Sequence, residues 1–132
     1  MSLIGRRKGR PTTKHQFQLI LKKFLVFLKR ELKFNHNITI ILVDDVDFSK
    51  TNRTFGMMYS DKIVISTVNS HPIDILRTVA HEYIHHKQYI EGKTLNGNPG
   101  SVTENEANAK AGEIVRKYGK INPGLFDLIP IQ

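Results

Sequence analysis

The sequence predicts an α+β domain, and three patterns of residues support that prediction. Apolar residues recur at helical spacing over residues 12–33, β-branched residues dominate residues 37–45, and a second helical pattern covers residues 72–92. The chain has 132 residues, which is the length of one ordinary domain. We therefore expect residues 1–11 to form a flexible basic arm and residues 12–132 to form a single domain.

An N-terminal helix is predicted from Thr12 or Thr13 to about Lys33. One face of this helix is apolar, as is usual for a helix that packs on a core. Its apolar residues are Phe17, Leu21, Phe24, Leu25, Leu28 and Leu32. The opposite face is basic and carries Lys22, Lys29, Arg30 and Lys33. We expect an amphipathic helix with a positively charged outer surface.

Two later segments predict a sheet. The segment "NITIILVDD", residues 37–45, is expected to be a strand because β-branched residues favour extended backbone. Since both of its faces are apolar, we place it at the centre of the sheet. The segment "FGMMYSDKIVIST", residues 55–67, is typical of two short strands around a turn at Ser60 to Lys62. The expected sheet is short, mixed or antiparallel, and has about three strands.

Two more helices and a tail complete the predicted domain. The segment "NSHP" supplies capping residues and a proline suited to a first helical turn, so a helix is predicted from about Pro72 to Gly92. A further helix is expected from about Thr103 to Tyr118, closed by Gly119. The remaining "KINPGLFDLIPIQ" is apolar but interrupted by Pro and Gly, which predicts an irregular C-terminal tail laid over the body.

Composition narrows the possible chemistry. The chain has no cysteine, which excludes disulfides, a cysteine nucleophile and thiolate metal sites. Any metal must therefore be held by His, Asp or Glu. The N-terminus lacks the apolar stretch of a signal peptide, and lysines interrupt the most apolar segment. We expect a soluble, intracellular (cytoplasmic) protein that does not contact a membrane.

The positive charge is concentrated at one end of the chain. Residues 1–33 contain ten Lys or Arg and one acid, Glu31, which gives +9, while the whole chain carries +8. A basic segment of this kind could attract nucleic acid or another acidic partner. The alternative is a solvated basic surface that aids solubility without a dedicated partner.

The segment "TVAHEYIHHKQYIEGK" contains the spacing H-E-x-x-H at His81, Glu82 and His85. On a helix the two histidines lie one turn apart, off the apolar face, and can direct two ring nitrogens at one zinc ion. Glu82 is rotated away from both rings and would hold a water beside the metal as general base. The spacing arises by chance in roughly one chain of this composition in a hundred, so a third ligand matters.

The segment "SVTENEANAKAGEIV" offers three carboxylates as that ligand. Glu106 and Glu113 fall on the side that carries Lys110 and Lys117, each four residues before one of these lysines, and are expected to be solvent-side partners of them. Glu104 falls on the inward side of the helix, where a cation would satisfy its charge. The alternative for Glu104 is a capping box with Ser101.

"HEYIH", with "ENEAN" following it, resembles the gluzincin metallopeptidases, in particular the minigluzincins and the ImmA/IrrE-type peptidases of bacteria and phages. This resemblance covers roughly residues 54–118 and implies a zincin-like domain with one Zn²⁺. It implies that Glu104 is the third zinc ligand after His81 and His85, and that Asn108 supports the metal site. It further implies that an edge strand holds the substrate in extended form. Its residues would be Gly56, Met57, Met58 and Tyr59.

The chain departs from these families in two ways. The segment after the glutamate motif reads "AKAGEIVRKYGK", without the apolar, Phe-containing segment usual in the ImmA/IrrE type, so nothing indicates a repressor substrate. The chain also has no helix-turn-helix region with room to fold. Other zincin classes, which need a further downstream histidine, fit less well because no histidine follows His86. His86 itself is expected to be a surface residue or a support for the ligands.

The favoured hypothesis is a zinc metallopeptidase that cleaves a protein or peptide substrate, with Glu82 as general base. The alternative is a nucleic-acid-associated accessory protein whose zinc site is structural or inactive. Four tyrosines are candidates for stabilising the oxyanion, of which Tyr83 is the weakest because it falls on the packed face; they are Tyr59, Tyr83, Tyr89 and Tyr118. The tail could lie in the substrate cleft and inhibit the enzyme, or it could simply cover the core.

Overall fold

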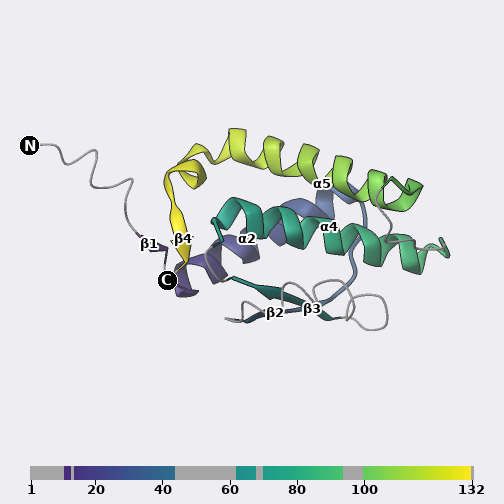
Figure 1. Ribbon diagram of the computed structural model, residues 1–132, viewed down its shortest axis with the longest axis horizontal. Coiled ribbons are helices and arrows are strands. Elements are labelled where there is room, and N and C mark those ends of the chain that lie inside the picture. The colour runs from purple at the N-terminus through teal and green to yellow at the C-terminus, as the bar shows by residue number, and fades with distance from the viewer. Residues whose placement is uncertain (1–10, 13, 44–61, 68–69, 94–99, 132) are drawn as a thin grey trace, which may run out of the picture.

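The computed structural model of the chain describes residues 11–12, 14–43, 62–67, 70–93 and 100–131. These residues form an α+β structure with three long helices and two pairs of short strands (Figure 1). The helices are α2 (Lys14–Leu32), α4 (Pro72–Ile90) and α5 (Val102–Ile121). In this part of the chain, no helix has both the length and the apolar character needed to cross a bilayer.

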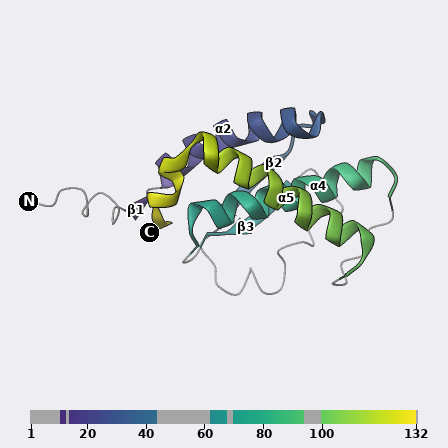
Figure 2. The ribbon, with the colours of Figure 1, turned by 90° about the horizontal axis from the view of Figure 1, so that it is seen from above.

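Helix α4 is the central element of the fold. It lies between the sheet on one side and α5 on the other, and α2 packs alongside (Figures 1 and 2). Leu76, Val79, Ala80 and Tyr83 on α4 have no solvent exposure. Because α4 is covered from several directions, polar residues on its flanks are buried as well as the apolar ones.

The first helix confirms the amphipathic prediction. Phe17, Phe24 and Leu28 are fully buried and Leu21 is nearly so, whereas the basic residues lie on the other side. Tyr118 of α5 packs on this face, with ring centroids 5.2 Å from Phe24 and 5.0 Å from Phe27. The apolar period of α2 therefore supplies one wall of the core.

The sheet differs from the prediction. Strand β2 (Thr39–Val43) pairs in parallel with β3 (Lys62–Ser66), from Thr39 opposite Lys62 to Val43 opposite Ser66. The second strand of the expected hairpin, after the turn at Ser60 to Lys62, is confirmed as β3, which already begins at Lys62. The first strand of that hairpin lies outside the described residues. A tight turn can join only antiparallel strands. The turn residues that predict a hairpin therefore give no information about the parallel pairing of β2 with β3.

The central place in the sheet that was expected for residues 37–45 is not confirmed. Among the described residues β2 pairs with β3 alone, and Ile41 is 38% exposed. Strand β3 is the better buried of the two, with Ile63 and Ile65 turned into the core. The run of β-branched residues therefore predicted the presence of a strand correctly but did not predict how far the strand is buried.

The two ends of the described chain meet. Pro11 and Thr12 form β1, which pairs in parallel with β4 (Ile129–Ile131), and a 3₁₀ helix, η2 (Pro123–Asp127), joins α5 to β4. The tail covers the body as expected, but it is more regular than predicted, and Pro11 belongs to a strand instead of the expected arm. Helix α5 also continues two residues beyond Gly119, to Ile121.

Candidate metal centre

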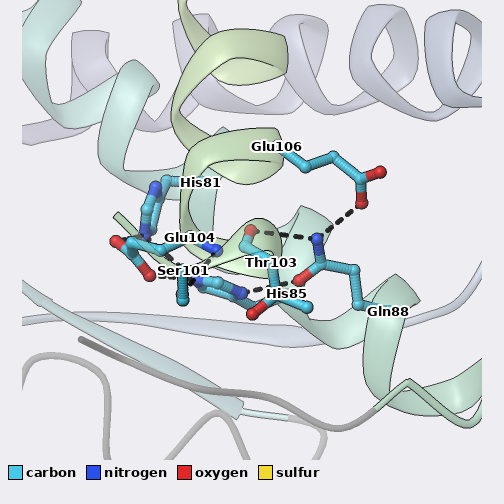
Figure 3. A network of polar contacts seen from close by, with 7 residues as sticks. All are labelled: His81, His85, Gln88, Ser101, Thr103, Glu104 and Glu106. Carbon is cyan, nitrogen blue, oxygen red and sulfur yellow. Dashed lines mark hydrogen bonds and ion pairs between the residues drawn. The ribbon is translucent and has the colours of Figure 1, made fainter. Parts of the chain in front are cut away.

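His81 and His85 face Glu104 across the contact between α4 and α5. The two helices run in opposite directions, so the second half of α4 lies beside the first turn of α5 (Figures 1 and 2). His81 Nε2 is 3.1 Å from Glu104 Oε1, His85 Nε2 is 3.0 Å from Glu104 Oε2, and the two Nε2 atoms are 3.1 Å apart. Figure 3 shows the three side chains converging. This group could hold a metal ion.

The spacing of these atoms suits a small tetrahedral cation. Ligand atoms placed about 2.1 Å from a tetrahedral zinc are separated from one another by roughly 3.4 Å. The two Nε2 atoms are 3.1 Å apart, and each lies 3.0 to 3.1 Å from a different Glu104 oxygen, so these separations are slightly shorter than that value. Two imidazoles and a carboxylate are also a donor set that zinc accepts, and they leave a fourth position for water.

Gln88 fixes the orientation of the His85 ring. The Gln88 side-chain nitrogen lies 3.1 Å from the Thr103 carbonyl oxygen and 2.6 Å from Glu106 Oε1, and it must donate to both because each is an acceptor. Gln88 Oε1 therefore faces His85 Nδ1, at 2.8 Å, and accepts a hydrogen bond from it (Figure 3). A neutral His85 with its proton on Nδ1 has a lone pair on Nε2, as metal binding requires.

That lone pair faces the Glu104 carboxylate. His85 Nε2 lies 3.0 Å from a Glu104 oxygen and 3.1 Å from His81 Nε2, which donates or accepts according to the tautomer of His81. A nitrogen lone pair and a carboxylate oxygen this close repel one another unless a proton or a metal cation lies between them. A cation at the point where the three side chains converge would remove this repulsion.

A support for Gln88 comes from α5 and from the chain just after α4. Glu106 accepts hydrogen bonds from Gln88 and from Lys93, whose Nζ lies 3.3 Å away. The Gln88 hydrogen bond is the main cause that holds the pKa of Glu106 below its ordinary value, and Lys93 and Lys87 add to it. Gln88 was missed by the sequence analysis, although its position three residues after His85 places both on one face of the helix.

The first turn of α5 combines two roles that the sequence analysis treated as alternatives. Ser101 is the N-cap of α5, and its hydroxyl accepts a hydrogen bond from the Glu104 backbone N–H at 3.3 Å. The Glu104 carboxylate nevertheless turns to the histidines. The cap orients the turn, and the side chain remains available as a ligand.

The other two glutamates of α5 lie on the solvent side, as predicted, but with different partners. Glu113 pairs with Lys110, three residues before it, at 3.2 Å, and not with Lys117. Lys117 instead pairs with Glu31 of α2, at 2.7 Å. Glu106 pairs with Lys93 and Gln88, not with Lys110. The spacing rule failed here because partners on neighbouring elements were available.

Solvent reaches one side of the centre. The His81 and Glu104 side chains keep 15% and 20% of their exposure, whereas that of His85 keeps 8%. Glu82, between the two histidines in sequence, is buried to 1% exposure. A fourth ligand can thus approach from solvent, whereas the Glu82 carboxylate lies in a poorly hydrated environment.

His86 is buried, at 3% exposure, which excludes a surface position, one of the two expected for it. A role in supporting the ligands remains a prediction. Its ring packs against that of His36, with centroids 4.6 Å apart. His36 belongs to the segment between α2 and β2, and this segment covers the side of α4 that bears His86.

The tyrosines divide by burial. Tyr83 is fully buried, and its hydroxyl lies 2.9 Å from the Phe34 carbonyl oxygen and accepts from the His36 backbone N–H at 3.1 Å. Burial raises the pKa of Tyr83 and of Tyr118, and both belong to the core. Tyr89 is half exposed near the end of α4, and Tyr59 lies outside the described residues.

Two groups of predicted site residues are not joined to this cluster. Asn108 lies one turn after Glu104 on α5 and is exposed, so its supporting role remains a prediction. The proposed substrate strand, Gly56, Met57, Met58 and Tyr59, falls outside the described residues.

Comparisons of this chain with protein-family models, with curated proteins and with solved structures give no match.

Proposed function

We propose that this chain is a zinc-dependent peptidase with a zincin-like, gluzincin-type site. The observation that carries the proposal is the convergence of His81 Nε2, His85 Nε2 and the Glu104 carboxylate at mutual distances of 3.0 to 3.1 Å. A histidine pair one turn apart with a glutamate from the next helix is an arrangement that binds zinc and leaves one position open. The H-E-x-x-H spacing adds Glu82 beside that position.

Bound at these three residues, Zn²⁺ would lower the pKa of a water molecule and polarise the carbonyl of a peptide bond. Glu82 would accept a proton from the attacking water and later donate it to the leaving amine. Glu82 is only 1% exposed, so this transfer would take place in poorly hydrated surroundings. His85 contributes an unprotonated Nε2, since Gln88 holds its proton on Nδ1.

Two outcomes compete with this proposal. In the first, a proton instead of a metal holds the three side chains together, and the cluster is a buried ion pair. In the second, zinc binds but serves structure alone, as in a nucleic-acid-associated accessory protein. A chain that binds no metal would indicate the first outcome. A chain that binds zinc but does not hydrolyse peptides would indicate the second.

Replacing Glu82 with Gln tests the proposal. We expect Glu82→Gln to keep one zinc per chain and to lose hydrolysis of unstructured peptides by a factor of about 10² to 10⁴, the usual contribution of a general base. Glu113→Gln is the matched control, because Glu113 is exposed and lies on the solvent side of α5, and it should keep full activity. Full activity in Glu82→Gln would overturn the mechanism, and zinc-loaded wild type without any hydrolysis would favour the structural site.

A further inference from the structure

The exposed side of α2 carries four basic residues, and Lys33 follows directly after its last residue, with the apolar Val26 exposed among them. The inner side is fully used by the core, with Phe17, Phe24 and Leu28 at 0% exposure. The residues of the basic surface are Lys22, Lys23, Lys29, Arg30 and Lys33, of which four are exposed and Lys29 is half-buried. We call this set the α2 basic surface.

The only acidic residue of α2 is turned away from this surface. Glu31 is rotated toward α5, where Lys117 pairs with it at 2.7 Å. Its charge is therefore neutralised on the inner flank of the helix. The α2 basic surface carries five cations with no carboxylate from its own helix among them.

The surface is open, and its cations form two groups. α2 lies along one edge of the molecule, and no other labelled element lies on its outer side (Figure 2). Lys22 and Lys23 form the first group and Lys29, Arg30 and Lys33 the second, and the span from Lys22 to Lys33 is roughly 16 Å at the rise of a helix. Lys29 and Arg30 in the last turn also complement the negative end of the helix dipole, but that effect fades within a turn and does not account for Lys22 and Lys23.

The kind of partner follows from what the surface contains and what it lacks. Five cations within roughly 16 Å on one side of the molecule suit a chain of phosphates, because duplex nucleic acid presents one negative charge per roughly 1.7 Å of its axis. The exposed large apolar residues on described α2 are Leu19 and Val26, and neither is aromatic. Proteins usually bind single-stranded nucleic acid by stacking its bases on aromatic side chains. A helix that binds a membrane surface inserts its apolar face into the lipid, but the apolar face of α2 packs on the core.

We propose that the α2 basic surface binds the phosphate backbone of duplex nucleic acid without reading its sequence. Binding would rest on about five phosphate contacts, which predicts a plot of log affinity against log salt concentration with a slope near −4 to −5. The surface lies on a different helix from the candidate metal centre. Binding of duplex and binding of metal are thus separate properties of the chain and can fail separately.

The test compares two charge-matched double variants of the full chain. Lys22→Gln with Arg30→Gln removes one Lys and one Arg from the α2 basic surface, and Arg116→Gln with Lys120→Gln removes the same pair from the exposed side of α5. Binding to a fluorescent DNA duplex of arbitrary sequence, and to its RNA counterpart, is followed by anisotropy from about 50 to 200 mM salt. A duplex of about 20 base pairs is long enough to span the surface.

We expect the α2 variant to bind the duplex about tenfold or more weakly, with a slope reduced by about 2, and the α5 variant to keep the wild-type slope. Binding of DNA alone or RNA alone would identify the duplex and still support the proposal. Equal losses in both variants would show that net charge, and not this surface, drives binding. No duplex binding at 50 mM salt, or binding to vesicles of anionic lipid in its place, would overturn the proposal.

Discussion

His85 and Gln88 form a hydrogen-bonded pair whose geometry prepares one ring nitrogen for a metal. Gln88 is almost fully buried, and its two donor contacts, to Thr103 and Glu106, leave its oxygen for His85. Residues that orient a ligand in this way commonly affect metal affinity nearly as much as the ligands themselves. The pair therefore links α5 to the metal centre a second time, beside Glu104.

Replacing Gln88 with Leu removes the acceptor that holds the proton on His85 Nδ1. We expect zinc affinity, measured by competition with a chelator, to fall by about 10- to 100-fold, because the ring is then free to adopt the other tautomer. Lys87→Met is the control, since its partner Glu91 lies at the end of α4, away from the histidines, and it should leave zinc affinity unchanged. Unchanged affinity in Gln88→Leu would show that the ring needs no such support.

Tyr83 ties the segment between α2 and β2 to the central helix. Tyr83→Phe removes the hydroxyl from its contacts with Phe34 and His36, and we expect the free energy of unfolding to fall by about 1 to 2 kcal/mol. Tyr89→Phe, on the exposed end of the same helix, should change it by less than about 0.5 kcal/mol. Chemical denaturation of the three proteins measures both effects.

The contribution of Tyr83 also depends on pH. Burial raises the pKa of the folded state above the ordinary value, so the folded chain holds this proton more tightly than the unfolded chain. The stabilisation is fully present below about pH 10 and is lost as pH rises through the folded-state pKa. The difference between wild type and Tyr83→Phe should therefore shrink above pH 10, and a difference that grows there would contradict this account.

At the scale of elements, two glycines of α5 differ in what surrounds them. A methyl group added at Gly119 would lie 2.7 Å from the Phe126 ring of η2, whereas one added at Gly112 would meet only the end of the flexible Arg116 side chain, at 3.3 Å. Gly119 is buried and allows η2 to pack closely on the end of α5. Gly112 has no comparable neighbour.

Alanine substitutions at these two positions should have different effects. Gly112→Ala is expected to stabilise the protein by about 0.5 to 1 kcal/mol, because alanine favours the helix. Gly119→Ala gains the same helical preference but must displace Phe126, and we expect no net gain or a loss of about 1 kcal/mol. Thermal unfolding of both variants measures the difference, and equal stabilisation would mean that η2 does not pack on Gly119 as described.

The elements also show where sequence patterns succeed. The three long helices were predicted to within a few residues, because apolar period, caps and closing glycines are local signals: Pro72 opens α4 and Ser101 caps α5. The direction and depth of β2 were not predicted, since they depend on β3, whose position follows from the whole fold. The pairing of β1 with β4 joins opposite ends of the chain and leaves no local signal.

In the candidate site, too, local sequence signals predicted some residues, whereas contacts between elements were not predicted. His81, His85 and Glu104 were predicted from spacing and helical phase, and the structure brings all three together. Gln88 and the true partners of Glu106 were not predicted, because they depend on how α4 and α5 face each other. The burial of His86 was missed because it depends on His36, distant in sequence.

At the scale of the whole molecule, two features lie at opposite ends of the packed pair α4 and α5. The His81, His85 and Glu104 cluster lies between the second half of α4 and the first turn of α5, and η2 and β4 cover the other end (Figure 1). Gly119, on which η2 packs, lies fifteen residues after Glu104, roughly 22 Å along the helix. The described tail is therefore remote from the metal centre, which favours its covering role over an inhibitory one.

A metal at the cluster would then act as a clamp between two helices as well as a reagent. A ligand that binds only the folded state stabilises it, by about 4 kcal/mol when its free concentration is a thousand times its dissociation constant. Loss of one ligand should therefore remove both the zinc and that stabilisation. The other contacts between α4 and α5 remain in such a variant, so the fold itself should persist.

The zinc content of the purified chain, measured by elemental analysis beside Glu104→Ala and Glu82→Gln, tests the central claim most directly. We predict one zinc per chain in the wild type and in Glu82→Gln, and almost none in Glu104→Ala, because Glu104 supplies a ligand and Glu82 does not. A wild-type chain that binds no zinc after exposure to it, or a Glu104→Ala chain that retains its zinc, would contradict the assignment of His81, His85 and Glu104 as a metal centre.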